Sequence, residues 1–146
     1  MRTAVALGAD AVIISGHAAD PFDPKSVTAS RGCVFTLPVV TIDSATQLAA
    51  WRDQAEPGCR PQLVGTSGAA ATALTSVDLR GPLLIALGNE AQGLAHGLRE
   101  DCDALLAIPM AGAATADSLN VAAAAAIVLY EITRQRDPSR PPDTPV

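Results

Sequence analysis

Residues Pro82–Leu94 read PLLIALGNEAQGL, an apolar run that ends on a glycine and continues directly into an amide and a carboxylate. A related pattern follows at Ile108–Met110 (IPM), and Ser118–Val121 (SLNV) then opens a helix rich in alanine. Each stretch predicts a buried strand that delivers polar groups into a loop and then a helix. Open α/β proteins build small-molecule sites from such strand ends, so the pair predicts that fold class and such a site.

The rest of the chain alternates between strand-like and helix-like segments. Expected strands span Ala9–Ser15, Val34–Ile42 (interrupted by Pro38), Gln62–Val64, Leu83–Leu87 and Ala104–Ile108. Expected helices span Pro24–Ser30 after Asp23, Asp43–Ala55 with Leu48 and Trp51 at i, i+3 spacing, Ala91–Asp101 and Ser118–Arg134. The stretch Ala69–Ser76 is weakly specified. This alternation predicts one domain over residues 1–136, with a parallel sheet covered by helices on both faces. Residues 137–146 are rich in Pro, Asp and Arg and are expected to form a disordered tail.

The composition of the chain indicates which classes of protein it can belong to. The chain has 146 residues, 49% of them hydrophobic, and no apolar run approaches the ~20 residues of a membrane span. The first residues show no signal-peptide pattern, so we expect a cytoplasmic protein without a membrane partner. Three widely spaced cysteines fit neither a disulfide framework nor a zinc site, and we interpret them as reduced core thiols. We expect no metal.

The formal net charge is −5, which is a poor electrostatic footprint for a protein that binds nucleic acid by itself. Affinity for phosphate depends on cations that release counterions from the nucleic acid. Any function on RNA therefore needs a local cluster of cations, a partner subunit or a further segment.

Gly88, Asn89 and Glu90 form the first candidate site. A glycine at the end of a buried strand lets a ligand approach the backbone closely, and the start of the following helix offers free amide donors. Glu90 could equally do no more than complement a helix dipole. The spacing of Gly88 and Gly93 is not a dinucleotide fingerprint, and no P-loop lysine follows.

Ser118, Leu119 and Asn120 form the second candidate. Asp117 or Ser118 is a natural N-cap for the last helix, and capping does not explain Asn120, a poor helix former expected in its first turn. Its expected buried face carries Val121, Ala125, Val128 and Ile132. Arg2 is a third candidate, although a terminal arginine is usually solvated. We interpret His17 and His96 as incidental.

Together these residues resemble the SpoU (TrmH) family of RNA ribose 2′-O-methyltransferases, members of the SPOUT superfamily. The family's first motif, an Asn followed by Gly-x-x-x-Arg-x-Ala-x-x-x-Gly, is represented here by Arg2–Gly8. Its second motif matches Leu87–Leu94, and its third matches Ile108–Met110 with Ser118–Ala122. The resemblance also includes Asp23–Gly32 and extends from Arg2 to about Ile132.

The resemblance implies a parallel sheet flanked by helices, with a C-terminal deep trefoil knot that binds S-adenosylmethionine as cofactor. The residues implied to bind it are Leu87, Gly88, Asn89, Gly93, Ile108, Met110, Ser118 and Leu119. The family's active site is completed across a homodimer, which suits an alanine-rich last helix. The implied partners are a second copy of the chain and rRNA or tRNA.

The resemblance also assigns the roles in catalysis, with residues 1–136 as the catalytic domain. Arg2 binds the ribose hydroxyl and flanking phosphate and stabilises the developing alkoxide. Ser118 and Asn120 orient Arg2 or the substrate, and Glu90 orders the loop beneath them. Because Arg2 is next to the terminus, where backbones fray, we expect weak methyl transfer.

Two other functions remain open at this point. One is a knotted dimer that binds cofactor or RNA with little turnover, since the chain starts inside the first motif. The other is an unrelated α/β enzyme that uses residues 88–90 to hold a phosphate, against which the third motif argues.

Overall fold

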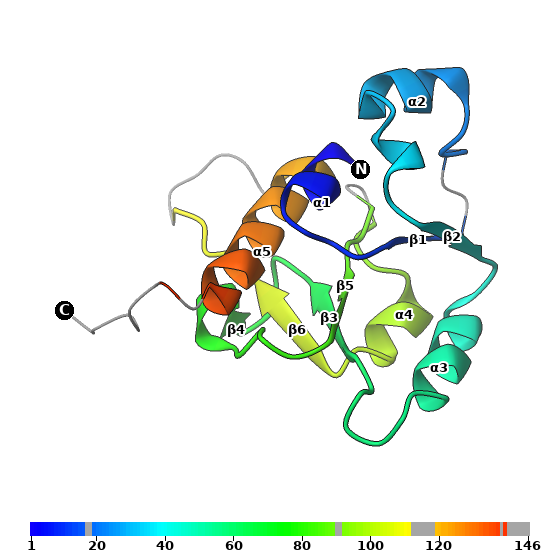
Figure 1. Ribbon diagram of the computed structural model, residues 1–146. Helices are drawn as coiled ribbons and strands as arrows, with labels where there is room; N and C mark the ends of the chain where they lie inside the picture. Colours follow the sequence, from blue (N-terminus) through cyan, green and yellow to red (C-terminus); the bar gives the residue numbers. More distant parts are fainter. Residues whose placement is uncertain (17–18, 90–91, 112–118, 138, 140–146) are drawn as a thin grey trace.

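The computed structural model describes residues 1–16, 19–89, 92–111, 119–137 and 139. Its helices are α1 (Arg2–Ala6), α2 (Pro24–Ser30), α3 (Ala45–Asp53), α4 (His96–Glu100) and α5 (Val121–Arg136), with short 3₁₀ turns η1 (Cys33–Phe35) and η2 (Leu74–Ser76). Its strands are β1 (Val12–Ser15), β2 (Val39–Ile42), β3 (Gln62–Thr66), β4 (Thr72–Ala73), β5 (Leu83–Ala86) and β6 (Ala104–Ala107). Helices and strands alternate along most of the chain (Figure 1). Most of the expected tail lies outside the described residues.

The strands form two parallel sheets, where the sequence predicts one. β1 pairs with β2, and the larger sheet has the order β4-β6-β3-β5. β3 lies between β5 and β6, with Gly65 paired to Ala86 on one side and to Leu105 on the other. Because parallel strands end at the same edge of a sheet, the residues after β5 and β6 emerge together. This arrangement brings the two predicted strand-end motifs to one edge.

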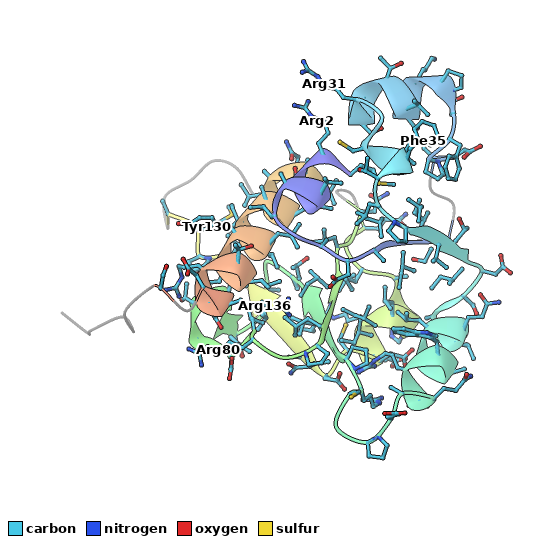
Figure 2. All side chains as sticks on the ribbon, in the orientation of Figure 1. Arg2, Arg31, Phe35, Arg80, Tyr130 and Arg136 are labelled. Carbon is cyan, nitrogen blue, oxygen red and sulfur yellow. The ribbon has the colours of Figure 1, made fainter. Side chains whose placement is uncertain are left out.

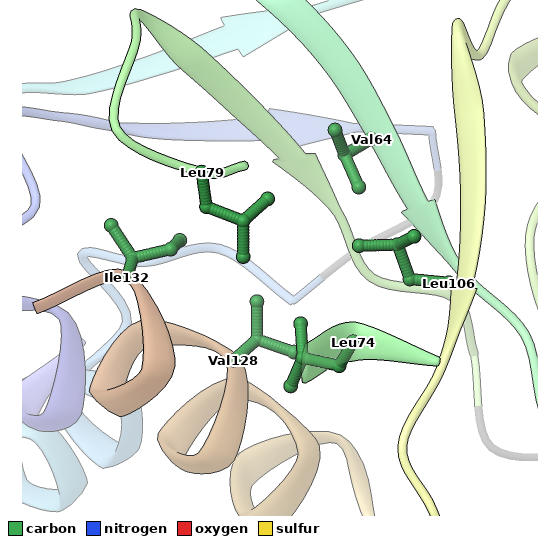
Figure 3. Close-up of a cluster of buried hydrophobic side chains, with 6 residues drawn as sticks. All are labelled: Val64, Leu74, Leu79, Leu106, Val128 and Ile132. Atoms are coloured by element: carbon green, nitrogen blue, oxygen red, sulfur yellow. The ribbon is translucent and has the colours of Figure 1, made fainter. Parts of the chain in front are cut away.

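One face of the larger sheet is covered by α5. Val64 and Leu106 of the sheet pack against Val128 and Ile132 of the helix, and Leu74 and Leu79 complete this cluster (Figure 3). Burying a large aliphatic side chain stabilises a fold by about 1.5–3 kcal/mol. Val128 and Ile132 confirm the predicted inner face of the last helix, whereas Val121 is 42% exposed.

The opposite face of the sheet is covered by α3 and α4. Leu63 and Ala86 pack with Leu48 of α3, and Leu98 of α4 is packed against them. Neighbouring residues such as Leu63 and Val64 thus enter opposite clusters, as the period of two in a strand requires. The prediction of a sheet covered on both faces is confirmed for this larger sheet.

Several predicted boundaries were wrong, and turn chemistry explains two of them. The expected strand Val34–Ile42 begins as η1, because Gly32 has a φ of 76° and its carbonyl accepts the Phe35 N–H. The helix expected over Ala91–Asp101 is reduced to α4, since Asn89 and Gly93 pair with each other first. The weakly specified stretch Ala69–Ser76 contains β4 and η2.

The last helix begins at Val121 and has 16 residues. Asn120 is its N-cap, and the Asn120 side chain accepts a hydrogen bond from the Ala123 N–H at 2.7 Å. The expectation that Asp117 or Ser118 caps this helix is therefore wrong. Among the described residues, no helix has both the length and the apolar character that crossing a membrane requires.

The cysteines are free, as predicted, but not all of them belong to the core. Cys59 is exposed, and Cys33 and Cys102 are half-buried. Burial and then the charge of Asp103 raise the pKa of the Cys102 thiol, which donates a hydrogen bond to the Leu98 carbonyl. Cys102 is therefore a protonated, structural thiol at neutral pH. In the described part of the chain, no group of three potential metal ligands is present.

A buried arginine, which was not predicted from the sequence, connects α3 to the sheet. Arg52 is 2% exposed, whereas Trp51, which the helical spacing favoured, is 54% exposed. Arg52 donates to the Pro61 carbonyl at 3.1 Å and pairs with the carboxylate of Asp103. That carboxylate also accepts the Leu63 N–H at 2.7 Å. The pair therefore links α3, β3 and the start of β6.

Replacing Asp103 with asparagine is expected to lower the free energy of unfolding at pH 7. Burial alone would raise the pKa of Asp103, but the Leu63 N–H hydrogen bond and the Arg52 charge outweigh it, so the pKa lies below its ordinary 3.8. We expect a loss of about 2 kcal/mol, less than the ~3–5 kcal/mol typical of a fully buried pair, because Asp103 is 35% exposed.

Urea unfolding from pH 7 down to pH 3 tests this expectation. A group whose pKa is lowered by folding stabilises the protein above its ordinary value and loses that effect as the pH falls through the folded pKa. The difference between wild type and Asp103→Asn should therefore shrink below pH 3.8. Asp53→Asn is the control, since Asp53 is 68% exposed in its pair with Arg60. A pH-independent difference would contradict the assigned role of the charge.

Candidate functional site

The carboxyl edge of the larger sheet brings together the second and third motifs with a segment between them. The Thr66 hydroxyl donates to the Ala86 carbonyl at 3.4 Å, and the Ser67 N–H donates to the Leu106 carbonyl at 2.9 Å. Residues 66 and 67 thus lie between the ends of β5 and β6. The sequence analysis missed them because it ended the strand at Val64, although a small-residue run after a strand was the available signal.

The second motif forms a closed loop at this edge. The Asn89 N–H donates to the Gly93 carbonyl at 2.9 Å, and the Gly93 N–H donates to the Asn89 carbonyl at 2.7 Å. Gly93 has a φ of +68°, a conformation that glycine adopts without strain. These two hydrogen bonds fix the backbone on both sides of Glu90, which itself lies outside the described residues.

Gly88 is in backbone-to-backbone contact with the returning arm of the same loop. A Cβ at this position would lie 2.2 Å from the Gly93 carbonyl carbon and 2.4 Å from the Leu94 nitrogen. Backbone atoms cannot move aside as the end of a flexible side chain can, so the position excludes every residue except glycine. The space that a side chain at Gly88 would occupy is thus filled by the loop itself, and the expectation that a ligand approaches the backbone here stays a prediction.

The apolar residues of the second and third motifs keep part of their surface open to solvent. Met110 is 42% exposed and Leu119 is 37% exposed, while Leu87 and Ile108 are half-buried. Ile108 packs against the core cluster under α5 and is thereby held in place. Partly exposed apolar side chains of this kind suit contact with a flat heteroaromatic ring.

Arg2 lies on α1, whose five residues pack against α5 (Figure 1). The Thr133 hydroxyl of α5 also donates to the Leu7 carbonyl at 3.2 Å, just after α1. The expected fraying around Arg2 is therefore not what the structure shows. The Arg2 side chain is exposed and extends away from the body of the protein (Figure 2).

A cleft of ≈ 650 Å³ opens beside Arg2 between α1, α2 and the start of α5. Its wall includes Arg2, Ser26, Ser30 and Ala122. Ala122 is the last residue of the third motif, and Asn120 precedes it by two positions. The structure therefore brings the predicted catalytic arginine close to the end of the third motif, and none of the residues predicted to bind the cofactor lines this cleft.

Three further predicted site residues remain to be placed. Asn120 is explained as a helix cap, which fixes its side chain at the start of α5 and leaves its amide nitrogen available. Ser118, predicted for both catalysis and cofactor binding, lies outside the described residues, as does Glu90.

Comparison with known proteins gives a consistent picture. Residues 1–130 match the SpoU rRNA Methylase family. The chain is 42% identical over 146 residues to a 23S rRNA (uridine(2479)-2′-O)-methyltransferase of Streptomyces viridochromogenes, covering 99% of this chain and 50% of that protein. It is 38% identical over 136 residues to the 23S rRNA (guanosine-2′-O-)-methyltransferase RlmB of Xanthomonas axonopodis pv. citri, covering 93% and 52%.

Among solved structures, the chain is similar to the crystal structure of the SpoU methyltransferase AviRb from Streptomyces viridochromogenes in complex with the cofactor AdoMet. The TM-score is 0.88 at 43% sequence identity, and the match covers 95% of this chain and 52% of that chain. The chain thus spans about half the length of the relatives it matches.

Proposed function

This chain belongs to the SpoU rRNA methylase family, and we propose that it transfers the methyl group of S-adenosylmethionine to a ribose 2′-hydroxyl of ribosomal RNA. Residues 1–136 would be the catalytic domain. The observation that carries the proposal is the closed loop at Asn89–Gly93, set at the shared carboxyl edge of β5 and β6. Ribosomal RNA is a cytoplasmic substrate, so the activity would take place in the cytoplasm.

The cofactor would bind at this edge of the sheet. The adenine ring would lie among Leu87, Ile108, Met110 and Leu119, which present partly open apolar surface. Backbone groups at Gly88, Asn89 and Gly93 would meet its polar edge, and Ser118 completes the proposed set. The fit rests on the incompletely covered side chains of the four apolar residues and on the position of the loop at the carboxyl edge of the sheet.

The cofactor supplies an electrophilic methyl group when bound. The protein therefore needs to position the attacking 2′-oxygen and stabilise the charge that develops on it as its proton leaves. Arg2 suits this task because it lines the cleft and its guanidinium offers several hydrogen-bond donors in a fixed planar arrangement. We propose that Asn120 and Ser118 orient Arg2 or the ribose, and that Glu90 orders the loop beneath them.

We also infer that the chain is knotted between β5 and α5. Support comes from the backbone contact of Gly88 with Gly93 and Leu94 and from the position of β3 between β5 and β6. Family membership favours the same deep trefoil knot. A crystal structure in which the chain after β6 does not thread through an earlier part of the chain would contradict it.

We propose further that the protein is a homodimer with α5 at or beside the interface. Ile127 is 39% exposed and Tyr130 is 56% exposed, and Tyr130 extends from the outer side of α5 (Figure 2). Light scattering at micromolar concentration should give about twice the 14.8 kDa of one chain. Ile127→Arg should shift the protein toward the monomer, whereas Val40→Arg, at a 49% exposed valine on β2, should not. A wild-type mass of one chain would contradict the dimer.

Calorimetric titration with S-adenosylhomocysteine, the product form of the cofactor, tests the cofactor site. We expect saturable binding in the micromolar range typical of enzyme ligands. If millimolar ligand produces neither heat nor a thermal shift, the proposed function is wrong.

A further inference from the structure

Five of the nine cationic side chains in the described ranges already have a partner within the fold. Arg52, Arg60, Arg80 and Arg134 form ion pairs, and Arg136 donates to the Gly81 carbonyl at 2.6 Å. Across the described ranges, four cationic side chains have neither an ion pair nor a hydrogen bond: Arg2, Lys25, Arg31 and Arg99. Three of these four belong to α1 and to α2 with its cap, the elements that form the cleft.

Arg31 is next in sequence to the wall of this cleft and is not itself part of that wall. It follows Ser30, which lines the cleft together with Arg2. Figure 2 shows the Arg31 and Arg2 side chains extending at the same end of the molecule, from α2 and α1 respectively. Both side chains are exposed, so both guanidinium groups are available to a ligand that lies over the cleft.

The backbone at Arg31 is unusual for an arginine. Within the described ranges, Arg31 is the one residue other than glycine with a positive φ, at 52°. It caps α2, its N–H donates to the Thr28 carbonyl at 3.0 Å, and the Gly32 N–H donates to the Val27 carbonyl at 3.1 Å. Glycine and asparagine adopt this conformation more readily, and arginine in the same conformation is less stable by about 1 kcal/mol. Because an arginine is kept here despite this cost, we infer that its positive charge has a function.

We propose that Arg31 binds a backbone phosphate of the RNA substrate. Arg31 and Arg2 together would bind the phosphates on either side of the target ribose. This inference rests on the proposed function for its choice of polyanion. Arginine matches phosphate geometry with two parallel hydrogen bonds, and an acidic protein needs such local cations to overcome its repulsion of RNA. The cleft beside Arg2 has a volume of ≈ 650 Å³, which is large enough to admit a nucleotide.

The salt dependence of RNA binding tests this assignment. The probe is a fluorescein-labelled 23S rRNA fragment around uridine 2479, the nucleotide named for the Streptomyces relative. Arg31→Asn removes the charge and tolerates the positive φ, Arg31→Lys keeps the charge, and Arg99→Gln removes an unpaired arginine on α4. Anisotropy titrations at several salt concentrations give the affinity and its slope. Parallel assays give the KM for RNA, the kcat and the affinity for S-adenosylhomocysteine.

We expect Arg31→Asn to weaken RNA binding ~5–10-fold at low salt and to reduce the salt slope by about 0.7–1, as the loss of one phosphate contact requires. The KM for RNA should rise while kcat and cofactor affinity stay near wild type, and Arg31→Lys should recover most of the loss. Arg99→Gln should change none of these quantities.

An unchanged slope in Arg31→Asn, or an equal loss in Arg99→Gln, would overturn the assignment. A wild-type protein that does not bind the RNA would also overturn it. The same holds if Arg31 binds inorganic phosphate but Arg31→Asn does not change the affinity for RNA. The proposed function fails separately, when the wild-type protein binds the RNA but transfers no methyl group to it.

Discussion

Replacing Gly88 with alanine is expected to abolish binding of S-adenosylmethionine while leaving the protein folded. The added Cβ would lie 2.2 Å from the Gly93 carbonyl carbon, so the 88–94 loop has to open. Overpacking against backbone costs about 3 kcal/mol or more here, which corresponds to at least ~100-fold in affinity if the loop is the cofactor site. Calorimetry with S-adenosylhomocysteine measures the loss.

Gly97→Ala is the matched control for this substitution. Gly97 lies in α4, and no atom lies within 4 Å of the position that its Cβ would occupy. This variant should bind cofactor as wild type does and should be slightly more stable, because alanine favours a helix by about 1 kcal/mol over glycine. Circular dichroism separates loss of the site from loss of the fold. A folded Gly88→Ala protein with wild-type affinity would show that the cofactor binds elsewhere.

Replacing Arg2 with alanine is expected to lower the rate of methyl transfer by ~100- to 1,000-fold, as loss of a group that stabilises a developing oxyanion does. Cofactor affinity should stay unchanged, because Arg2 lines the cleft between α1, α2 and α5 rather than the loop at residues 88–94. Single-turnover transfer to saturating RNA measures the chemical step apart from RNA binding.

Arg99→Ala is the control for the Arg2 substitution, since Arg99 is also exposed and lies on α4. It should retain wild-type transfer. If Arg2→Ala transfers methyl groups at the wild-type rate, the assignment of the family's catalytic arginine to this position is wrong. The expectation of weak transfer in the wild-type chain stays a prediction, although the packing of α1 on α5 removes the fraying on which it was based.

Regular periodicity and capping residues made much of the fold predictable. Asp23, followed by Pro24, starts α2 as expected, and the side chain of Asp23 accepts the Lys25 N–H at 2.9 Å. The β5 and β6 segments were clear from their continuous apolar runs. Local patterns could not show that the strands divide into two sheets, because that depends on pairing between distant segments. They also could not show that Arg52 is buried, because its partner Asp103 lies 51 positions further on.

The candidate site was predictable where a motif sits at the end of a strand. Gly88 and Gly93 were identified from sequence, and the structure explains them through a tight loop. Asn120 was identified because it was expected inside the first turn of the helix. The helix begins only at Val121, so Asn120 is its N-cap. Arg31 was included in the resemblance over Asp23–Gly32 but was given no role, because neither its positive φ nor its lack of an ion pair can be read from a linear sequence.

The most direct test of the central claim is transfer from methyl-tritiated S-adenosylmethionine to unmodified 23S rRNA, followed by mapping of the product. We predict that tritium enters the RNA and is recovered as a 2′-O-methyl nucleotide that resists alkaline cleavage, at a rate that Arg2→Ala reduces ~100-fold or more. Tritium recovered on a base, or no transfer by a protein that binds both cofactor and RNA, would contradict ribose 2′-O-methylation by this chain.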